Sequence, residues 1–162
     1  MKILELFAGS RSIGKVAEAL GMEVYSSDLI QFDGIDYAVS ILDFDVSKVP
    51  FKPDIIWASP PCTAFSVASI GRNWNYDKTP KTDGARFGIQ LVEKTIEIIK
   101  HFDPKYFFIE NPRGMLRKMP IMEEFDRKTV TYCQYGDSRM KPTDIWTNSN
   151  LWIPRNMCSN GD

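Results

Sequence analysis

The stretch Asp54-Ile55-Ile56-Trp57-Ala58-Ser59-Pro60-Pro61-Cys62 joins an apolar run to a reactive side chain. A short continuous apolar run of this kind is typical of a strand that is buried on both faces of a parallel sheet. The two prolines that follow remove two backbone donors and stiffen the chain, which helps to hold a thiol in place. Cys62 is therefore a candidate nucleophile at the end of a buried strand.

A carboxyl group follows a second apolar run about fifty residues later. Lys105–Ile109 predicts another buried strand, and Glu110 comes directly after it. A carboxyl group in such a place is costly unless it is paired, protonated or used in chemistry. Open α/β sheets hold their ligands at the carboxyl ends of their strands, so we expect Cys62 and Glu110 at one sheet edge. The structural alternatives are an inert buried cysteine and an ion pair of Glu110 with Arg113 or Arg117.

Strand and helix patterns alternate along the chain, and we find no repeats or low-complexity tracts. This alternation predicts an α/β fold with one mostly parallel central sheet and helices on both faces. A long polar loop is expected over residues 71–88. The expected strands are 2–7, 23–28, a short third element ending at Asp43, 54–58, 105–109, 129–132 and 144–147, and the expected helices are 12–20 and 89–102.

Composition limits the class of protein. A length of 162 residues with 43% hydrophobic content suits one domain, and a net charge of −1 permits a nucleic-acid partner without demanding one. The N-terminus lacks the pattern of a signal peptide, and no apolar run approaches a membrane span, so we expect a soluble cytoplasmic protein. The three cysteines have no paired spacing, which suits neither a disulfide framework nor a metal site, and a reduced compartment is expected.

The first strand and helix predict a nucleoside site. Gly9 lies in a turn of small residues between them, and Asp28 follows nineteen residues later at the end of the second strand. A carboxylate there can accept hydrogen bonds from ribose hydroxyls, and Asp43 could accept one from an adenine amino group. The alternative is that both are ordinary solvated carboxylates.

Residues 134–143 combine a glycine turn with two cations, which could hold an anion or simply be solvated.

As a set, these residues resemble the DNA cytosine-5 methyltransferase family. The family's motifs occur in its usual order between Lys2 and about Thr147, and the likeness is closest to short phage or prophage members, as in restriction-modification systems. Glu5–Gly14 looks like the cofactor loop, Asp28 and Asp43 like the acidic cofactor ligands, Ser59–Ser66 like the nucleophile motif, and Glu110-Asn111 like the Glu-Asn motif.

The resemblance implies a Rossmann-like fold that uses S-adenosylmethionine, with a catalytic domain over residues 1–150 and an irregular tail over 151–162 that could begin a further region. It implies no metal, and a cytoplasmic setting in a bacterial or phage-infected cell. Cys62 would attack C6 of a cytosine flipped out of DNA while Glu110 protonates or hydrogen-bonds N3, with Arg139 as a third catalytic residue and residues 71–88 as a closing loop. The cofactor-binding residues would be Phe7, Gly9, Asp28, Leu29, Asp43 and Pro61.

Several positions depart from the family pattern. Arg11 stands where glycine is usual, Pro112 where valine is common, and the basic motif is approximated by Arg139-Met140-Lys141. No target-recognition region is recognisable, so one alternative is a truncated module that binds cofactor or DNA without turnover. An amino-methyltransferase is another alternative, but it would need an aromatic residue in place of Cys62. The target sequence, the oligomeric state and the choice of RNA or DNA stay open.

Overall fold

The structure is a computed structural model, and it describes residues 1–158 of the chain. These residues form two compact units. The first unit comprises residues 1–60 and 89–109, and the second comprises residues 61–88 and the part of the chain from Glu110 onward. The chain thus leaves the first unit twice, once just before Cys62 and once just before Glu110.

The first unit is built on parallel strands. They are β1 (Lys2–Leu6), β2 (Glu23–Asp28), β3 (Tyr37–Ala38), β4 (Ile55–Ala58) and β5 (Tyr106–Pro112), in the order β3-β2-β1-β4-β5. Leu4 on the central strand β1 pairs in register with Tyr25 on one side and Ile56 on the other. Leu4, Leu6, Ile56 and Ile109 are fully buried, so the apolar runs form the middle of this core.

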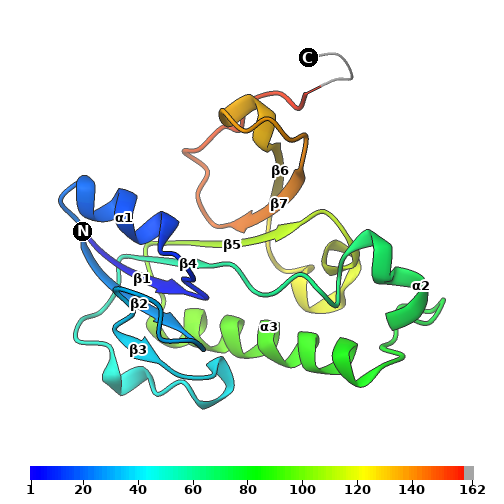
Figure 1. The fold of residues 1–162 in the computed structure, drawn as a ribbon, viewed down its shortest axis with the longest axis horizontal. Helices are drawn as coiled ribbons and strands as arrows, with labels where there is room; N and C mark the ends of the chain where they lie inside the picture. The colour runs from blue at the N-terminus through cyan, green and yellow to red at the C-terminus, as the bar shows by residue number, and fades with distance from the viewer. Residues whose placement is uncertain (159–162) are drawn as a thin grey trace. The chain divides into compact units, whose positions relative to one another are not determined.

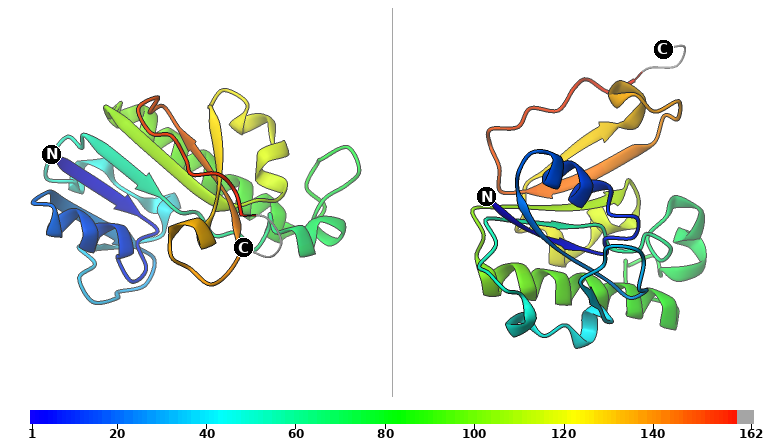
Figure 2. Two further views of the ribbon diagram at one scale, coloured as in Figure 1. Left: turned by 90° about the horizontal axis from the view of Figure 1, so that it is seen from above. Right: turned by 60° about the vertical axis from the view of Figure 1, so that its left-hand side comes forward.

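Helices cover both faces of this sheet. The helix α1 (Ser12–Ala19) lies on one face, and the part of α3 (Asp83–Phe102) that belongs to the first unit lies on the other, as Figures 1 and 2 show. Val92, Ile96 and Ile99 recur at helical spacing on α3 and are buried. Two short 3₁₀ turns, η1 (Ile41–Asp43) and η2 (Val46–Lys48), follow β3.

The second unit holds the last residues of β5 and an antiparallel pair, β6 (Arg127–Thr131) and β7 (Pro142–Thr147). Strand β7 follows β5 in the sheet order, and β6 is the last strand, so the sheet has seven strands and is mostly parallel. The remaining elements of this unit are short: η3 (Val67–Ser69), α2 (Ile70–Asn73), η4 (Met115–Lys118), η5 (Pro120–Met122) and η6 (Tyr132–Tyr135).

The predicted fold class is confirmed, but three local predictions were wrong. The third strand is Tyr37–Ala38, and Asp43 instead ends a 3₁₀ turn that the hydroxyl of Ser40 caps. Residues 71–88 are not one loop, because α3 already begins at Asp83. Strand β5 runs on to Pro112, since the backbone beyond Ile109 finds a second sheet neighbour. Within residues 1–158, no helix is long and apolar enough to cross a membrane.

The expectation that the cysteines do not pair was also wrong. Cys133 and Cys158 form a disulfide across 25 residues, with their Cα atoms 6.6 Å apart. The N–H of Cys158 donates to the hydroxyl of Thr131 at 2.8 Å, which brings the end of the described chain back to the end of β6. Linear spacing did not reveal this pair, because the two cysteines are 25 residues apart and meet only in the folded second unit. Residues 159–162 of the predicted tail lie outside the described residues.

Candidate active site

Strands β4 and β5 end at the same edge of the first unit. Ala58 and Ile109 are register partners in this parallel pair, and both are fully buried. From Ala58 the chain needs only Ser59-Pro60-Pro61 to reach Cys62, whereas Glu110 follows Ile109 directly. The segments that carry Cys62 and Glu110 therefore begin at the same edge of the sheet, as expected.

Cys62 is a half-buried free thiol. Its carbonyl accepts a hydrogen bond from the N–H of Phe65 at 2.9 Å, so the thiol lies at the start of a tight turn. Phe65 is fully buried and stacks on Trp74, with the two ring centroids 5.5 Å apart. The turn is thus anchored by its apolar end, while the cysteine end stays accessible.

The segment after Cys62 is bonded to the segment after Glu110. The N–H of Met115 donates to the carbonyl of Phe65 at 2.7 Å. Gly114 passes so close that a Cβ built on it would lie 2.2 Å from the same carbonyl oxygen. Glycine is therefore required at position 114 for the two segments to meet.

Glu110 has a defined hydrogen-bond partner within the second unit. The hydroxyl of Tyr132 donates to Oε1 of Glu110 at 2.8 Å. Burial, with the negative charge of Glu110, raises the pKa of Tyr132 to about 12, so this phenol keeps its proton at neutral pH. The ammonium of Lys141 lies 5.8 Å from the centre of the Tyr132 ring.

The basic residues near the site have partners of their own. Arg117 pairs with the fully buried Asp144 through two hydrogen bonds of 2.9 and 2.6 Å, rather than with Glu110. Arg139, the predicted catalytic cation, is exposed and pairs with Asp137 at 2.8 Å. Hydrogen bonds from Arg139 lower the pKa of Asp137 to about 2. The structure thus places Lys141, and not Arg139, over the Tyr132 ring.

The predicted cofactor residues Gly9 and Asp28 meet within the first unit. The N–H of Gly9 donates to Oδ2 of Asp28 at 2.8 Å, and Oδ1 of Asp28 accepts from Ile30 at 3.0 Å. Phe7 precedes this contact with a φ of 55°. A bulky side chain is rarely found in that left-handed region, and such strain is concentrated at functional sites. The turn between β1 and α1 is therefore tied to the end of β2.

Three other predicted cofactor residues are exposed. Leu29 follows Asp28 and is 70% exposed, which is high for a leucine. Asp43 lies exposed on η1, and Pro61 is exposed directly before Cys62. Exposure leaves all three available for contact with a ligand.

Arg11, which stands where the family usually has glycine, does not point to solvent. Its side chain is buried, donates to the hydroxyl of Ser26 at 2.9 Å and pairs with Glu18. Glu5 shares that hydroxyl at 3.0 Å and accepts from the N–H of Gly14 at 2.7 Å, in the first turn of α1. Burial raises the pKa of Glu5.

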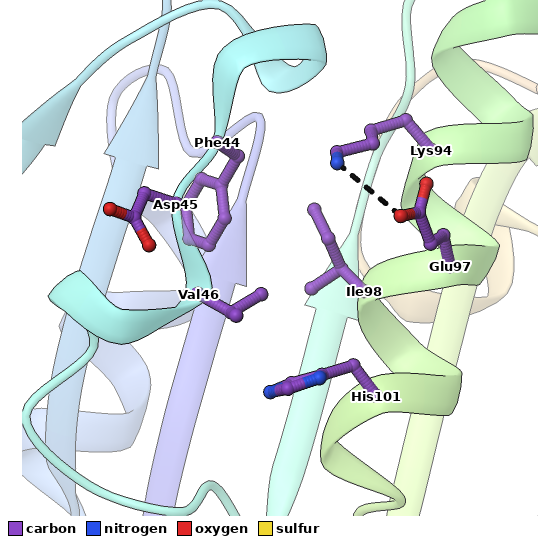
Figure 3. A pocket seen from close by; sticks show the side chains of 7 residues that line it. All are labelled: Phe44, Asp45, Val46, Lys94, Glu97, Ile98 and His101. Carbon is purple, nitrogen blue, oxygen red and sulfur yellow. Dashed lines mark ion pairs between the residues drawn. The ribbon is translucent and has the colours of Figure 1, made fainter.

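A pocket of about 180 Å³ lies elsewhere in the first unit (Figure 3). Lys94, Glu97 and His101 project into it from α3 and face the segment that follows η1, with Lys94 and Glu97 paired at 3.6 Å. The pocket contains none of the predicted site residues. Its full lining is Phe44, Asp45, Val46, Lys94, Glu97, Ile98 and His101.

The sequence matches a family model over most of its length. The model describes the C-5 cytosine-specific DNA methylase and covers residues 1–128. The chain belongs to this family. The matched part includes the segments of Gly9, Asp28, Cys62 and Glu110, but not the basic turn around Arg139.

Relatives of this methylase family differ in how much of their length the chain spans. A probable DNA (cytosine-5)-methyltransferase of Frog virus 3 (isolate Goorha) is 35% identical over 96% of the chain and 74% of the viral protein. The Type II methyltransferase M.HpaII of Haemophilus parainfluenzae is 30% identical over 69% of the chain, but this is only 31% of the bacterial enzyme. The fold matches a crystal structure described as a DNA modification methyltransferase encoded within an E. coli prophage, with a TM-score of 0.64 and 15% identity over 91% of this chain and 46% of that one.

Three residues of the site were missed by the sequence argument. They are Tyr132, which contacts Glu110 22 residues away along the chain, Gly114, which lies against Phe65 49 residues away, and Glu5, which bonds Gly14 9 residues away. Glycine after Asn-Pro-Arg was a weak signal of close backbone approach, and Glu5 was noted only as part of the cofactor loop. Nothing in the local sequence marked Tyr132.

Proposed function

We propose that this chain transfers a methyl group from S-adenosylmethionine to C5 of cytosine in DNA, through a covalent bond between Cys62 and C6. One observation carries the proposal. A free, half-buried thiol and the carboxyl group of Glu110 belong to the same compact unit, in a chain of the C-5 cytosine-specific DNA methylase family. The bond between Met115 and Phe65 holds their segments together.

The first unit supports a nucleoside cofactor without phosphate groups. Phosphates usually bind at the N-terminus of the first helix of such a fold, where free N–H groups attract anions. Here the carboxyl group of Glu5 already accepts the N–H of Gly14 at that end of α1. A dinucleotide would have to compete with this buried carboxyl group, whereas S-adenosylmethionine has no phosphate to place there.

The remaining groups suit the parts of this cofactor. Asp28 can accept hydrogen bonds from the ribose hydroxyls, and exposed Leu29 offers an apolar surface for the adenine ring. Asp43 can accept from the adenine amino group. Phe7, Gly9 and Pro61 complete the proposed set, and the bound cofactor would supply an electrophilic methyl group.

Asp28→Asn is expected to weaken binding of S-adenosylmethionine about tenfold, because hydrogen bonds to a charged acceptor are worth roughly 1.5–3 kcal/mol. Calorimetry measures this affinity. Asp33→Asn changes an exposed carboxylate five residues away and should bind like the wild type. If the wild type, Asp28→Asn and Asp33→Asn bind with equal affinity and have the same melting temperature, Asp28 is not part of the cofactor site.

The chemistry follows from the two catalytic side chains. The thiolate of Cys62 adds to C6 of the flipped cytosine while Glu110 gives a proton to N3, and this makes C5 an electron-rich enamine carbon. C5 then takes the methyl group, after which a base removes the C5 proton, the Cys62–C6 bond breaks and the N3 proton returns to Glu110. Arg139 remains a candidate for holding an anionic group of the substrate, for which it would exchange its ion pair with Asp137.

The chain segment before α3 offers a surface for DNA. Residues 75–79 form a tight turn, in which the N–H of Asn75 donates to the carbonyl of Thr79 at 2.9 Å. The turn displays Tyr76 fully exposed. Trp74 anchors it by donating to the carbonyl of Ala64 at 2.8 Å, close to Cys62. Three exposed cations, Arg72, Lys78 and Lys81, lie along this segment, and Arg86 follows near the start of α3, where it pairs with Asp83.

Tyr76→Ala is expected to weaken duplex DNA binding about tenfold, since stacking on a base is worth roughly 1–3 kcal/mol. Fluorescence anisotropy at fixed salt measures this affinity. Tyr76→Phe keeps the aromatic ring and should retain most of the affinity. If alanine binds as tightly as phenylalanine, the exposed ring does not contact DNA.

The direct test of the function has two steps. Calorimetry establishes binding of S-adenosylmethionine, and a tritium-transfer assay on duplex DNA, with product digestion, establishes 5-methylcytosine. Binding without transfer, and without a covalent adduct on DNA that contains 5-fluorocytosine, would indicate a binding module. Transfer to RNA alone would change the substrate class.

A further inference from the structure

Tyr132 lies where β6 passes into the 3₁₀ turn η6, and it reaches across to Glu110 on β5. Its hydroxyl donates to Oε1 of Glu110 at 2.8 Å, a distance typical of a strong hydrogen bond. The two residues are 22 positions apart in the sequence, so the contact depends on the folded second unit. The carboxyl group of a glutamate otherwise rotates almost freely about its last torsion.

We propose that Tyr132 is a positioning residue that fixes Oε1 of Glu110, so that Oε2 is the oxygen presented to the base. This role rests on the proposed function of Glu110. Because a phenol donates to Oε1, the proton that the acid gives to N3 resides on Oε2. A single hydrogen bond thereby selects both the orientation of the carboxyl group and the oxygen that carries the proton.

The surroundings of Tyr132 keep it in the donor state. Burial and the charge of Glu110 raise its pKa to about 12, which leaves it protonated throughout the physiological range. A contact with the fully buried Thr143 on β7 lowers the pKa of Tyr132, but burial and the charge of Glu110 outweigh this effect. The other charged groups near the phenol are Lys141 over its ring and the pair formed by Asp137 and Arg139.

Tyr135 is a natural control on the same 3₁₀ turn. Its hydroxyl accepts a hydrogen bond from the N–H of Arg155 at 2.7 Å, and the Arg155 guanidinium lies 5.0 Å from its ring centre. Tyr135→Phe therefore removes a hydroxyl of the same turn that serves a different contact.

The first experiment separates positioning from substrate binding. Tyr132→Phe is expected to lower kcat for methyl transfer roughly tenfold to a hundredfold, because Glu110 becomes charged as it gives up its proton and then lacks the hydrogen bond that stabilises this charge. KM for duplex DNA should stay within about twofold, because the phenol does not touch the DNA in this proposal. Tyr135→Phe should keep the wild-type kcat. A wild-type kcat in Tyr132→Phe would overturn the positioning role.

The second experiment does not depend on turnover. A double-mutant cycle compares the denaturation midpoints of Tyr132→Phe, Glu110→Ala and the double variant of the full chain. The double variant should shift the midpoint by less than the sum of the two single shifts, whereas Tyr135→Phe and Glu110→Ala should add. Additive shifts for Tyr132 would show that the contact is absent and would overturn the inference. If the wild type transfers no methyl group, the proposed function fails and this cycle alone decides the contact.

Discussion

Cys62→Ala abolishes methyl transfer, with an expected fall in kcat of at least about 10⁴-fold, the scale seen when a covalent nucleophile is removed. The reason is electronic. C5 of a neutral cytosine is a poor nucleophile, and addition of a thiolate to C6 is what turns it into an enamine carbon. The substitution is conservative for the fold, because the thiol is half-buried and the turn is held by Phe65 and the Cys62 carbonyl rather than by sulfur.

Two measurements check this result. Tritium transfer to duplex DNA reports kcat, and a duplex containing 5-fluorocytosine traps the enzyme because fluorine cannot leave as the C5 proton does. Cys62→Ala should give no adduct, whereas Cys133→Ser/Cys158→Ser, which leaves Cys62 as the one cysteine of the chain, should still give one. Full activity in Cys62→Ala, or an adduct on a different residue, would contradict the covalent mechanism.

The segments that we propose for catalysis and cofactor binding could be singled out from the sequence because their signals are local. Cys62 follows a strand and two prolines, Glu110 follows a strand, and Gly9 lies in a turn, so each residue type has a chemical meaning at its own position. Parallel strands also align their carboxyl ends, which made a common edge for the Cys62 and Glu110 segments predictable. The register of Ala58 with Ile109 confirms that part of the argument.

The supporting contacts could not be predicted because their partners are distant in the sequence. Tyr132 has no local feature that sets it apart from Tyr135, yet only Tyr132 is bonded to Glu110. Cys133 and Cys158, which are 25 residues apart, likewise meet only in the folded second unit. Such pairings follow from tertiary structure, which a periodic pattern of apolar residues does not encode.

The polar segment 71–88 was also predicted wrongly, because its structure depends on contacts between residues that are not neighbours in the sequence. Its composition indicates a loop, but Trp74 is buried against Phe65, and the side chain of Asn73 accepts the hydroxyl of Thr82 at 2.9 Å. Thr82 in turn caps α3 by accepting the N–H of Ala85 at 3.1 Å. Tertiary contacts therefore override the loop propensity of this segment, and the proposed DNA contact is a structured turn rather than an open lid.

Gly114→Ala is expected to destabilise the fold by about 3 kcal/mol and to lower kcat about a hundredfold. Its Cβ would lie 2.2 Å from the carbonyl oxygen of Phe65, which is backbone and cannot turn aside as a flexible side chain could. The two segments must therefore separate, and the hydrogen bond between Met115 and Phe65 is stretched or lost. That bond joins the segments of Cys62 and Glu110, so a shift of about 1 Å misplaces the nucleophile relative to the acid.

Urea unfolding measures the loss of stability as a lower midpoint at constant slope, and single-turnover methyl transfer measures the loss of rate. Gly71→Ala is the matched control, because a Cβ at that exposed position in α2 meets no atom within 4 Å. It should leave both quantities unchanged or raise stability slightly, since alanine favours the helix over glycine. If Gly114→Ala unfolds and turns over like Gly71→Ala, the close approach of the two segments is not what holds the active site together.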